Sequence, residues 1–377
     1  MPSNNSKMLF SKTTTNHAKN MKRYSLLFFA LTVSLLGYAQ TTVLPFTPGI
    51  TPEGITYYLP KTELSVTITA TRTTQIPGDL NAYAKHYLKL NNVTQEKETE
   101  WKIDKVEVIP FGTPDTSKVY SIPLKKSTIA PLVSLTKSGL ILSVNKKTDE
   151  EANPQAPNID KTEKSNLNPR DYMSQEILQA GNTTKMAELT ANEIYDIRES
   201  RSELSKGQAD NLPKDGEQLK IMLNQLNTQE TALLQLFKGT TETETKTFTL
   251  TYYTSQNQKK AILCRFSDQK GIVGKDNLVG EPVYIDITDM KTIPAEQTDG
   301  KKKKTEEQSV RYNIPSDVNV KIYTREDKLV DITTPMAQFG KVEILSSELF
   351  NKRTDTQVLF QQTTGGIKEV TNTAETK

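Results

Sequence analysis

The sequence predicts an α+β fold in which two β-rich, sandwich-like domains flank a central antiparallel helical hairpin. Before residue 146 and after residue 240, apolar and polar side chains alternate over short stretches, as they do in half-buried strands. Between these parts, residues 170–238 repeat apolar side chains every three or four positions, the period of an amphipathic helix. Only 35% of the residues are hydrophobic and threonine is frequent, which favours strands with one exposed face over a large enzyme core.

The first part of the chain has the pattern of a secretory signal peptide. Residues 21–39, MKRYSLLFFALTVSLLGYA, begin with Lys22 and Arg23, continue with an apolar run and end in small residues. This order predicts export, with cleavage between Ala39 and Gln40. The apolar run is shorter than the roughly 20 residues that a transmembrane helix needs. We therefore expect a cleaved leader and no transmembrane segment in the mature chain.

Residues 1–20 are polar and do not fit ahead of a signal peptide, so Met21 is expected to be the true start. The whole chain has 48 basic and 45 acidic residues. Residues 1–40 hold five of the basic residues and none of the acidic ones, so the mature chain carries 43 against 45, a net charge of −2. A weakly acidic chain offers no overall electrostatic basis for binding nucleic acid.

Residues 40–145 are predicted to form the N-terminal β-rich domain. Within TELSVTITATRTT, residues 62–74, every second side chain is apolar, and WKIDKVEVIPFG and KSGLILSVN repeat the strand pattern further on. A short helical stretch, NAYAKHYLKL, interrupts the strands. Residues 146–169 then contain almost no apolar side chains and several prolines, which predicts a flexible linker.

Residues 170–239 are predicted to form the helical hairpin. A short helix ends at Gly181, the next is capped by Thr183 or Thr184, and a third starts near residue 215 and stops at Gly239. The short connection between the two long helices predicts that they are antiparallel neighbours.

Residues 240–377 are predicted to form the C-terminal β-rich domain. Six stretches in this part are strand-like: TFTLTYYT, AILCRFS, EPVYIDI, VRYNIP, VNVKIYT and GKVEIL. Residues 295–308, AEQTDGKKKKTEEQ, are a low-complexity insertion between them. Its four lysines favour a solvated hairpin tip over a binding surface for anions.

Each long helix carries one charged residue within its apolar stripe, Arg201 on the first and Glu230 on the second. A buried charge without a partner is costly, so each needs one. With a turn near residue 210, Arg201 and Glu230 would be about 15 Å apart along the helix axes. We therefore expect a structural ion pair between Arg198 and Glu230, with Arg201 bonded to backbone carbonyls or to a carboxylate of a β-domain.

Two ligand-binding interpretations remain open beside these structural ones. Glu193 and Glu230 could form a carboxylate pair of the kind that hydrolyses glycosides. Trp101, Tyr57 and Tyr58 could stack on a sugar ring, although tyrosines in strands more often lie at the edge of a core.

The residue inventory excludes several common chemistries. His86 is the only histidine of the predicted mature chain and Cys264 the only cysteine of the whole chain, so an intramolecular disulfide and the usual zinc sites are excluded. No serine elbow accompanies His86, and no glycine-rich phosphate loop occurs. Cys264 alternates with apolar residues and is expected to be buried and inert. We expect neither a metal nor a cofactor.

Several segments together resemble domain of unknown function family 4831, found in cell-envelope proteins of Bacteroidetes. They are GITYYLPKTELSVTI, YAKHYL, EIYDIRESRSEL, DGEQLKIMLNQLNTQETALLQLF, GEPVYI and AQFGKVEILSSELF, in this order. The resemblance covers roughly residues 43–370. It implies a secretory protein of a Gram-negative bacterium, and it transfers no catalytic residue.

These observations favour a non-enzymatic cell-envelope protein with a structural or partner-binding role. We expect it in the periplasm, associated with the outer membrane, or secreted from the cell. The expected partner is an unidentified envelope protein. The alternative is a glycan-binding protein, or one that hydrolyses glycans with carboxylates.

Overall fold

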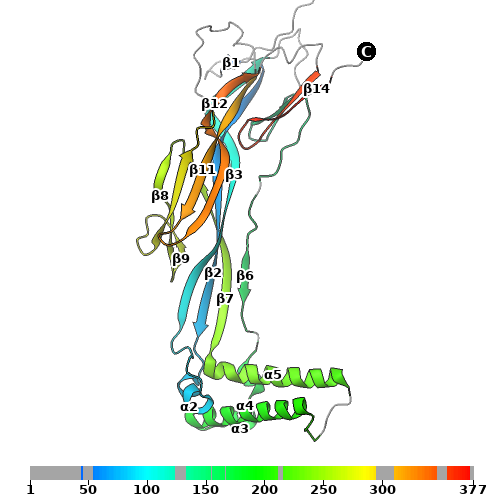
Figure 1. Cartoon of the computed structure of the whole chain (residues 1–377), viewed down its shortest axis with the longest axis vertical. Helices are drawn as coiled ribbons and strands as arrows, with labels where there is room; N and C mark the ends of the chain where they lie inside the picture. The colour runs from blue at the N-terminus through cyan, green and yellow to red at the C-terminus, as the bar shows by residue number, and fades with distance from the viewer. Residues whose placement is uncertain are drawn as a thin grey trace, which may run out of the picture.

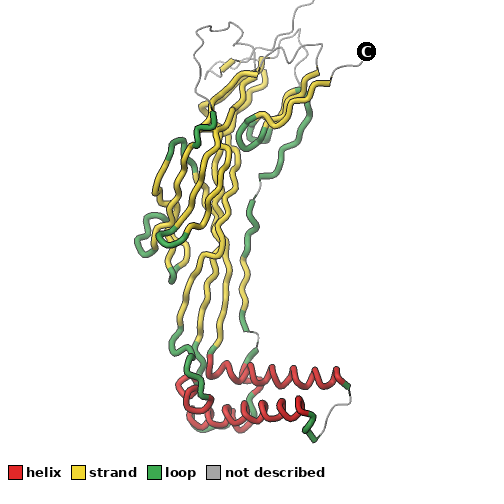
Figure 2. The backbone as a smooth tube through the Cα atoms, in the orientation of Figure 1, coloured by secondary structure: helices red, strands yellow, loops and turns green. Residues whose placement is uncertain are grey.

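The computed structural model describes residues 44–45, 54–123, 133–153, 155–165, 167–210, 215–293, 310–345 and 355–373. The predicted leader, with its cleavage position at Ala39 and Gln40, and the lysine-rich insertion 295–308 lie outside the described residues. The described part is elongated, with long strands running along it and a pair of helices lying across one end (Figures 1 and 2).

The longest strands form an antiparallel sheet that we call the spine sheet. Its order is β1-β3-β2-β7-β6. The strands are β1 (Leu44–Pro45), β2 (Gly54–Ile76), β3 (Glu98–Pro123), β6 (Asp160–Glu163) and β7 (Thr240–Tyr252). β2 pairs with β3 along most of its length and with β7 from Leu64 to Ile76. The spine sheet therefore joins strands that precede the two long helices to β7, which follows them.

Two smaller sheets pack on the spine sheet away from the helices (Figure 1). The second sheet has the order β12-β11-β10-β8-β9 and the third the order β14-β13-β5-β4. The second sheet contains β8 (Gln258–Ser267), β9 (Gly271–Val273), β10 (Glu281–Asp289), β11 (Val310–Tyr323) and β12 (Lys328–Leu345). The third contains β4 (Val133–Leu135), β5 (Ile141–Val144), β13 (Asp355–Phe360) and β14 (Ile367–Thr373).

Both β cores mix residues from the two halves of the sequence. In the larger core, Leu64 and Ile68 of β2 are packed with Val283 of β10 and Val320 of β11, all fully buried. In the smaller core, Tyr57 of β2 belongs to the same cluster as residues of β5, β11, β12 and β13. The described part is thus mostly antiparallel β-structure with a helical pair, but the expectation of two separate β-rich domains is wrong. Alternation along a strand reveals its buried face and not its pairing partner.

The predicted flexible linker is partly ordered as an edge strand. Residues 160–163 form β6, which pairs with β7 from Lys246 to Thr243. The segment around β6 runs beside the spine sheet toward the helices (Figure 1). Every residue of β6 is exposed, so the stretch has no apolar pattern from which a strand could be predicted.

The helices form a unit that we call the helical foot, namely α2 (Ala84–Leu88), α3 (Gln175–Leu178), α4 (Thr183–Lys206) and α5 (Gly216–Lys238). Two 3₁₀ turns, η1 (Asn81–Tyr83) and η2 (Pro169–Tyr172), accompany them. α4 and α5 pack through Ala187, Ile194, Leu233 and Phe237, which are fully buried. α4 is capped by the Asn182 side chain, one residue before the predicted threonines, and its last residue is followed by Gly207 in the left-handed region.

The spine sheet and the helical foot meet through two glycines. A Cβ on Gly78 would lie 2.2 Å from the carbonyl oxygen of Leu236 in α5, and one on Gly239 would lie 2.1 Å from the carbonyl oxygen of Ile76. Gly239 also has a φ of +83°. The backbone of Leu80 donates to the Leu236 carbonyl at 2.7 Å. This close approach fixes the foot against the end of β2 and β7.

Candidate functional site: the ion-pair cluster of the helical foot

Glu230 is a buried acid on the helical foot. It lies on α5 between apolar residues that face α4, and only 8% of its surface is exposed. Arg198 and Arg201 reach it from α4, and each has about a third of its side chain exposed. The periodicity of both helices places these three charges at the seam between α4 and α5.

The carboxylate is bound at both oxygens. Arg198 donates from Nε to Glu230 Oε1 at 2.6 Å, and Arg201 donates from Nη1 to Oε2 at 2.5 Å. Arg201 Nη1 also donates to Asn227 Oδ1 at 2.8 Å. Burial alone would raise the pKa of Glu230, but the hydrogen bonds and charges of Arg198 and Arg201 outweigh it and lower this pKa. The carboxyl is therefore ionised at neutral pH.

The predicted Arg198–Glu230 contact is present, but the prediction for Arg201 is wrong. We expected Arg201 to bond to backbone carbonyls or to a β-domain carboxylate because a turn near residue 210 would separate it from Glu230. Instead α4 ends at Lys206, α5 begins at Gly216, and α5 extends beyond the end of α4 (Figure 1). This offset brings Glu230 toward the C-terminal part of α4, within reach of both arginines.

The geometry does not favour the carboxylate pair considered for glycoside hydrolysis. A general acid in such a pair needs a raised pKa, whereas Glu230 has a lowered one and is bonded at both oxygens. The cluster is arranged to hold charge in place rather than to transfer a proton.

The three aromatic residues proposed for sugar stacking do not form one surface. Trp101 of β3 is opposite Arg72 of β2. Arg72 lies 15 positions beyond Tyr57 along β2, which corresponds to about 50 Å of strand. Tyr57 is fully buried, and its hydroxyl donates to the Arg311 carbonyl and accepts from the Arg311 amide. Tyr58 is half-buried and its ring contacts Gly139. The stacking prediction is therefore wrong, because alternation along β2 turns Tyr57 into the core.

Trp101 instead packs between the spine sheet and the β8–β9 end of the second sheet. It is 9% exposed, and its ring packs edge-on against Phe248 at a centroid distance of 6.2 Å. Gly271, the first residue of β9, lies against the same ring, and the Trp101 amide donates to the Asp268 carbonyl at 2.6 Å. With both neighbours in place, the indole is not available to a ligand.

The remaining reactive side chains are isolated from one another. Cys264 is 2% exposed, and burial raises the pKa of its thiol to about 11, so it stays protonated and unreactive. His86 is exposed in the middle of α2, and its ring packs edge-on with that of Tyr87. The part of the chain that the structure describes contains no group of three or more His, Cys, Asp or Glu residues suited to a metal ion. None of its helices has the length and apolar content needed to cross a bilayer.

A buried polar cluster joins the three sheets, and sequence reasoning did not single it out. Asn313 of β11 is fully buried, and its Nδ2 donates to the carbonyls of Pro60 at 2.9 Å and Thr364 at 2.8 Å. Thr62 of β2 donates from its hydroxyl to the Thr363 carbonyl at 3.0 Å. The sequence contains no signal for its burial, because Asn313 stands at a polar position of the alternation Val310, Tyr312 and Ile314. Because these side chains bond to backbone carbonyls of neighbouring segments, we assign the cluster a structural role.

Comparison with known proteins identifies one family and no characterised relative. The family model described as "Domain of unknown function (DUF4831)" matches residues 53–368. No curated protein and no solved structure matches the chain.

Proposed function

Because the chain belongs to the DUF4831 family, a domain of unknown function, we propose its role from its architecture. We propose a non-enzymatic, exported cell-envelope protein that holds a partner-binding unit away from its two smaller β-sheets. The helical foot is the proposed docking unit, and the spine sheet is the spacer. Export is inferred from the leader pattern of residues 21–39. The proposed location is the periplasm or an association with the outer membrane, with secretion from the cell as the alternative.

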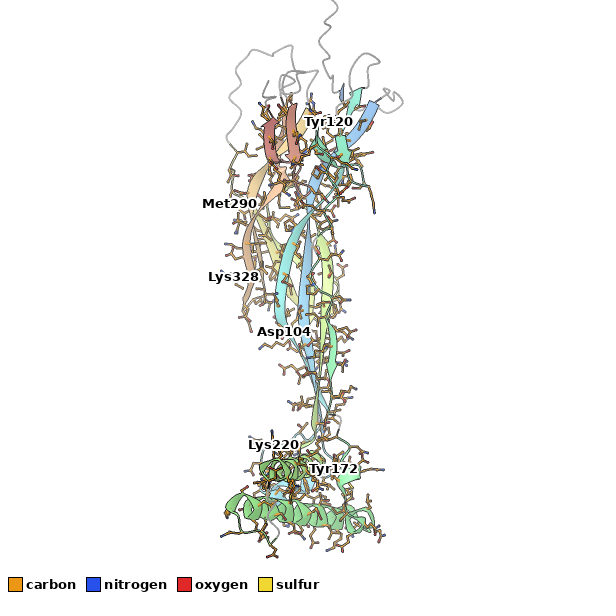
Figure 3. The ribbon with its side chains drawn as sticks, turned by 90° about the vertical axis from the view of Figure 1, so that its right-hand side faces the viewer. Asp104, Tyr120, Tyr172, Lys220, Met290 and Lys328 are labelled. Atoms are coloured by element: carbon orange, nitrogen blue, oxygen red, sulfur yellow. The ribbon has the colours of Figure 1, made fainter. Side chains whose placement is uncertain are left out.

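The observation that carries this proposal is the separation of the foot from the β cores. In Figure 3, Tyr120 and Met290 lie toward one end of the molecule, Lys220 and Tyr172 at the other, and Asp104 on the narrow part between them. The foot has its own apolar core, distinct from the two β cores. It also exposes large apolar side chains, with Ile221 65% and Met222 40% exposed. Such side chains are typical of contact surfaces when they gather on one element.

The test is site-specific crosslinking in the native host. A photoreactive amino acid is introduced at Met222 on the foot and, as a matched control, at Lys328 on the edge of the second sheet, both of which are exposed. We expect the chain in the envelope fraction without its leader, and one identified envelope protein crosslinked from position 222 and not from position 328. Equal crosslinking from both positions, or the uncut chain in the cytosol, would contradict the proposal.

An assay for hydrolysis of envelope glycans addresses the enzymatic alternative. We expect no turnover above that of heat-treated protein. Turnover that disappears when one acidic residue is replaced would overturn the non-enzymatic assignment. No contact among the described residues favours the glycan-binding alternative, so it is not proposed.

A further inference from the structure

The ion-pair cluster of the foot has an unbalanced charge. Two guanidinium groups, those of Arg198 and Arg201, surround the single carboxylate of Glu230, so the cluster carries a net charge of +1. Over the residues that the structure describes, Glu230 is the only acid within ion-pair distance of either arginine. Glu199 follows Arg198 by one position and Glu203 follows Arg201 by two. The helical period therefore turns both acids to other faces of α4.

Much of the hydrogen-bonding capacity of these arginines faces outward. A guanidinium has five N–H donors. Arg198 uses Nε on Glu230, and Arg201 uses Nη1 on Glu230 and Asn227. The side chains are 36% and 35% exposed, whereas that of Glu230 is 10% exposed. The carboxylate therefore sits behind the arginines, and their remaining donors lie toward the solvent.

The arginines are also held in place before any ligand arrives. Glu230 fixes both, Asn227 fixes Arg201, and the Arg198 guanidinium lies 5.7 Å from the ring centre of Tyr195. Tyr195 is itself anchored, because its hydroxyl donates to the Tyr87 carbonyl at 2.9 Å, and its side chain remains 43% exposed. A preorganised surface loses little conformational entropy on binding. Tyrosine and arginine are, with tryptophan, the residues most enriched at the energetic centres of interfaces.

We propose that Tyr195, Arg198, Arg201 and Asn227 form a receptor for a carboxylate on an acidic segment of the partner protein. One incoming carboxylate would neutralise the net charge of +1 and give a balanced set of two arginines and two acids. The planar donor edge of a guanidinium matches a carboxylate with two parallel hydrogen bonds. A phosphate group carries more negative charge than the cluster can neutralise. The proposal rests on the proposed function and names the chemistry of the partner.

The test measures binding of a dye-labelled hexaglutamate peptide to the full mature chain by fluorescence anisotropy. Arg201→Gln removes the excess charge and leaves the Arg198–Glu230 pair neutral. We expect it to weaken binding at least about tenfold. Arg325→Gln is the control, because Arg325 is an exposed arginine on the β11–β12 turn and its loss changes the net charge equally. This control should bind as the unchanged protein does.

Three results would overturn the receptor: no binding of hexaglutamate, equal weakening by Arg201→Gln and Arg325→Gln, or displacement by inorganic phosphate at concentrations where added acetate does nothing. Thermal unfolding of each variant checks whether it is folded. Arg201→Lys keeps the charge but loses the planar donor edge, so it should weaken binding by an intermediate amount. If crosslinking at Met222 still captures the same partner while hexaglutamate fails to bind, the receptor is wrong and the proposed function stands.

Discussion

The charge of Glu230 is decided by two opposing effects on one carboxyl group. Burial between α4 and α5 favours the neutral acid, and the two arginines favour the carboxylate. The arginines prevail because both oxygens accept from a guanidinium. Removing the carboxylate would leave Arg198 and Arg201 close together without an acidic partner, so the loss should exceed that of an ordinary surface ion pair.

We expect Glu230→Gln to lower the free energy of unfolding by about 2 kcal/mol. This is less than for a fully buried pair, because both arginines are about one-third exposed and water can solvate them. Urea denaturation followed by circular dichroism measures the change. Glu199→Gln, at an exposed position of the neighbouring helix α4, should change stability by less than about 0.5 kcal/mol. Equal effects of the two substitutions would show that the pair contributes nothing.

The same carboxyl gives a dependence of stability on pH with a defined sign. The pKa of Glu230 is lower in the folded chain than the usual 4.5, so the unfolded chain takes up its proton first as the pH falls. The stabilising contribution is complete above pH 4.5 and is lost as the pH drops through the lower, folded-state pKa. The difference in unfolding free energy between the unchanged chain and Glu230→Gln should therefore shrink below pH 4.5. A difference that stays constant to pH 2 would contradict this.

A single glycine governs how the only tryptophan packs. Gly271 has a φ of +73°, and a Cβ there would lie 2.9 Å from the Trp101 ring. We expect Gly271→Ala to destabilise the fold by about 1–3 kcal/mol through backbone strain and overlap. Because the chain contains one tryptophan, its fluorescence should also shift to the red as water reaches the indole. Gly274→Ala, where nothing lies within 4 Å, should leave both observables unchanged.

At the scale of elements, the part of the spine sheet nearest the helical foot extends past the second sheet and is not covered by it (Figure 1). β2 and β7 place threonines opposite each other in this region, as in the pairs Thr71–Thr245 and Thr73–Thr243. Threonine is both β-branched and polar, so it favours a strand while tolerating water on its face. Arg72 and Glu244 form an ion pair across the same two strands. The abundance of threonine in the sequence is explained by strands that lack a covering layer.

The threonines can be tested for their hydrogen bonds separately from their strand preference. The Thr71 hydroxyl lies 2.6 Å from Asp104 Oδ2 and 2.8 Å from the Thr245 hydroxyl. Thr73, on the same face of β2, has no side-chain hydrogen bond among the described residues. Thr71→Ala should therefore cost about 1 kcal/mol more than Thr73→Ala in urea denaturation. Equal costs would mean that strand preference alone supports this sheet.

The helices could be predicted from the sequence more closely than the sheets, because their signals are local. Asn182, Gly207 and Asp215 mark three of the four ends of α4 and α5 through capping and a left-handed turn. Arg201 and Glu230 stood out because they interrupt apolar stripes. Their mutual contact was missed, since it depends on how the connection between the helices offsets them, and that connection has no periodic pattern.

At the scale of the whole molecule, strands far apart in sequence share one sheet. β2 pairs with β7 although more than 160 positions separate Ile76 from its partner Thr240. The larger β core likewise takes residues from both sides of the helical foot. No property of β2 alone reveals this partner, because strand alternation is the same whichever strand lies beside it. The order of the elements therefore suggested separate domains where the structure has interleaved sheets.

The interleaving predicts that the N-terminal part does not fold alone. A fragment of residues 40–239 retains β2 and β3 but loses β7 and the whole second sheet that buries Leu64 and Ile68. We expect its strands to lack cooperative unfolding, with co-expression of residues 240–377 restoring it. Circular dichroism during thermal unfolding provides the measurement. A sharp transition of the β signal in the isolated fragment would show an independent domain.

The direction of the strands determines how the molecule responds to tension. Two of the four connections between the spine sheet and the helical foot leave from adjacent strands, β2 at Ile76 and β7 at Thr240. These strands are paired across all 13 residues of β7. A pull between the smaller sheets and the foot acts along both strands at once, so two continuous backbones that are already extended share the load. The molecule can thus transmit force along its length with little extension.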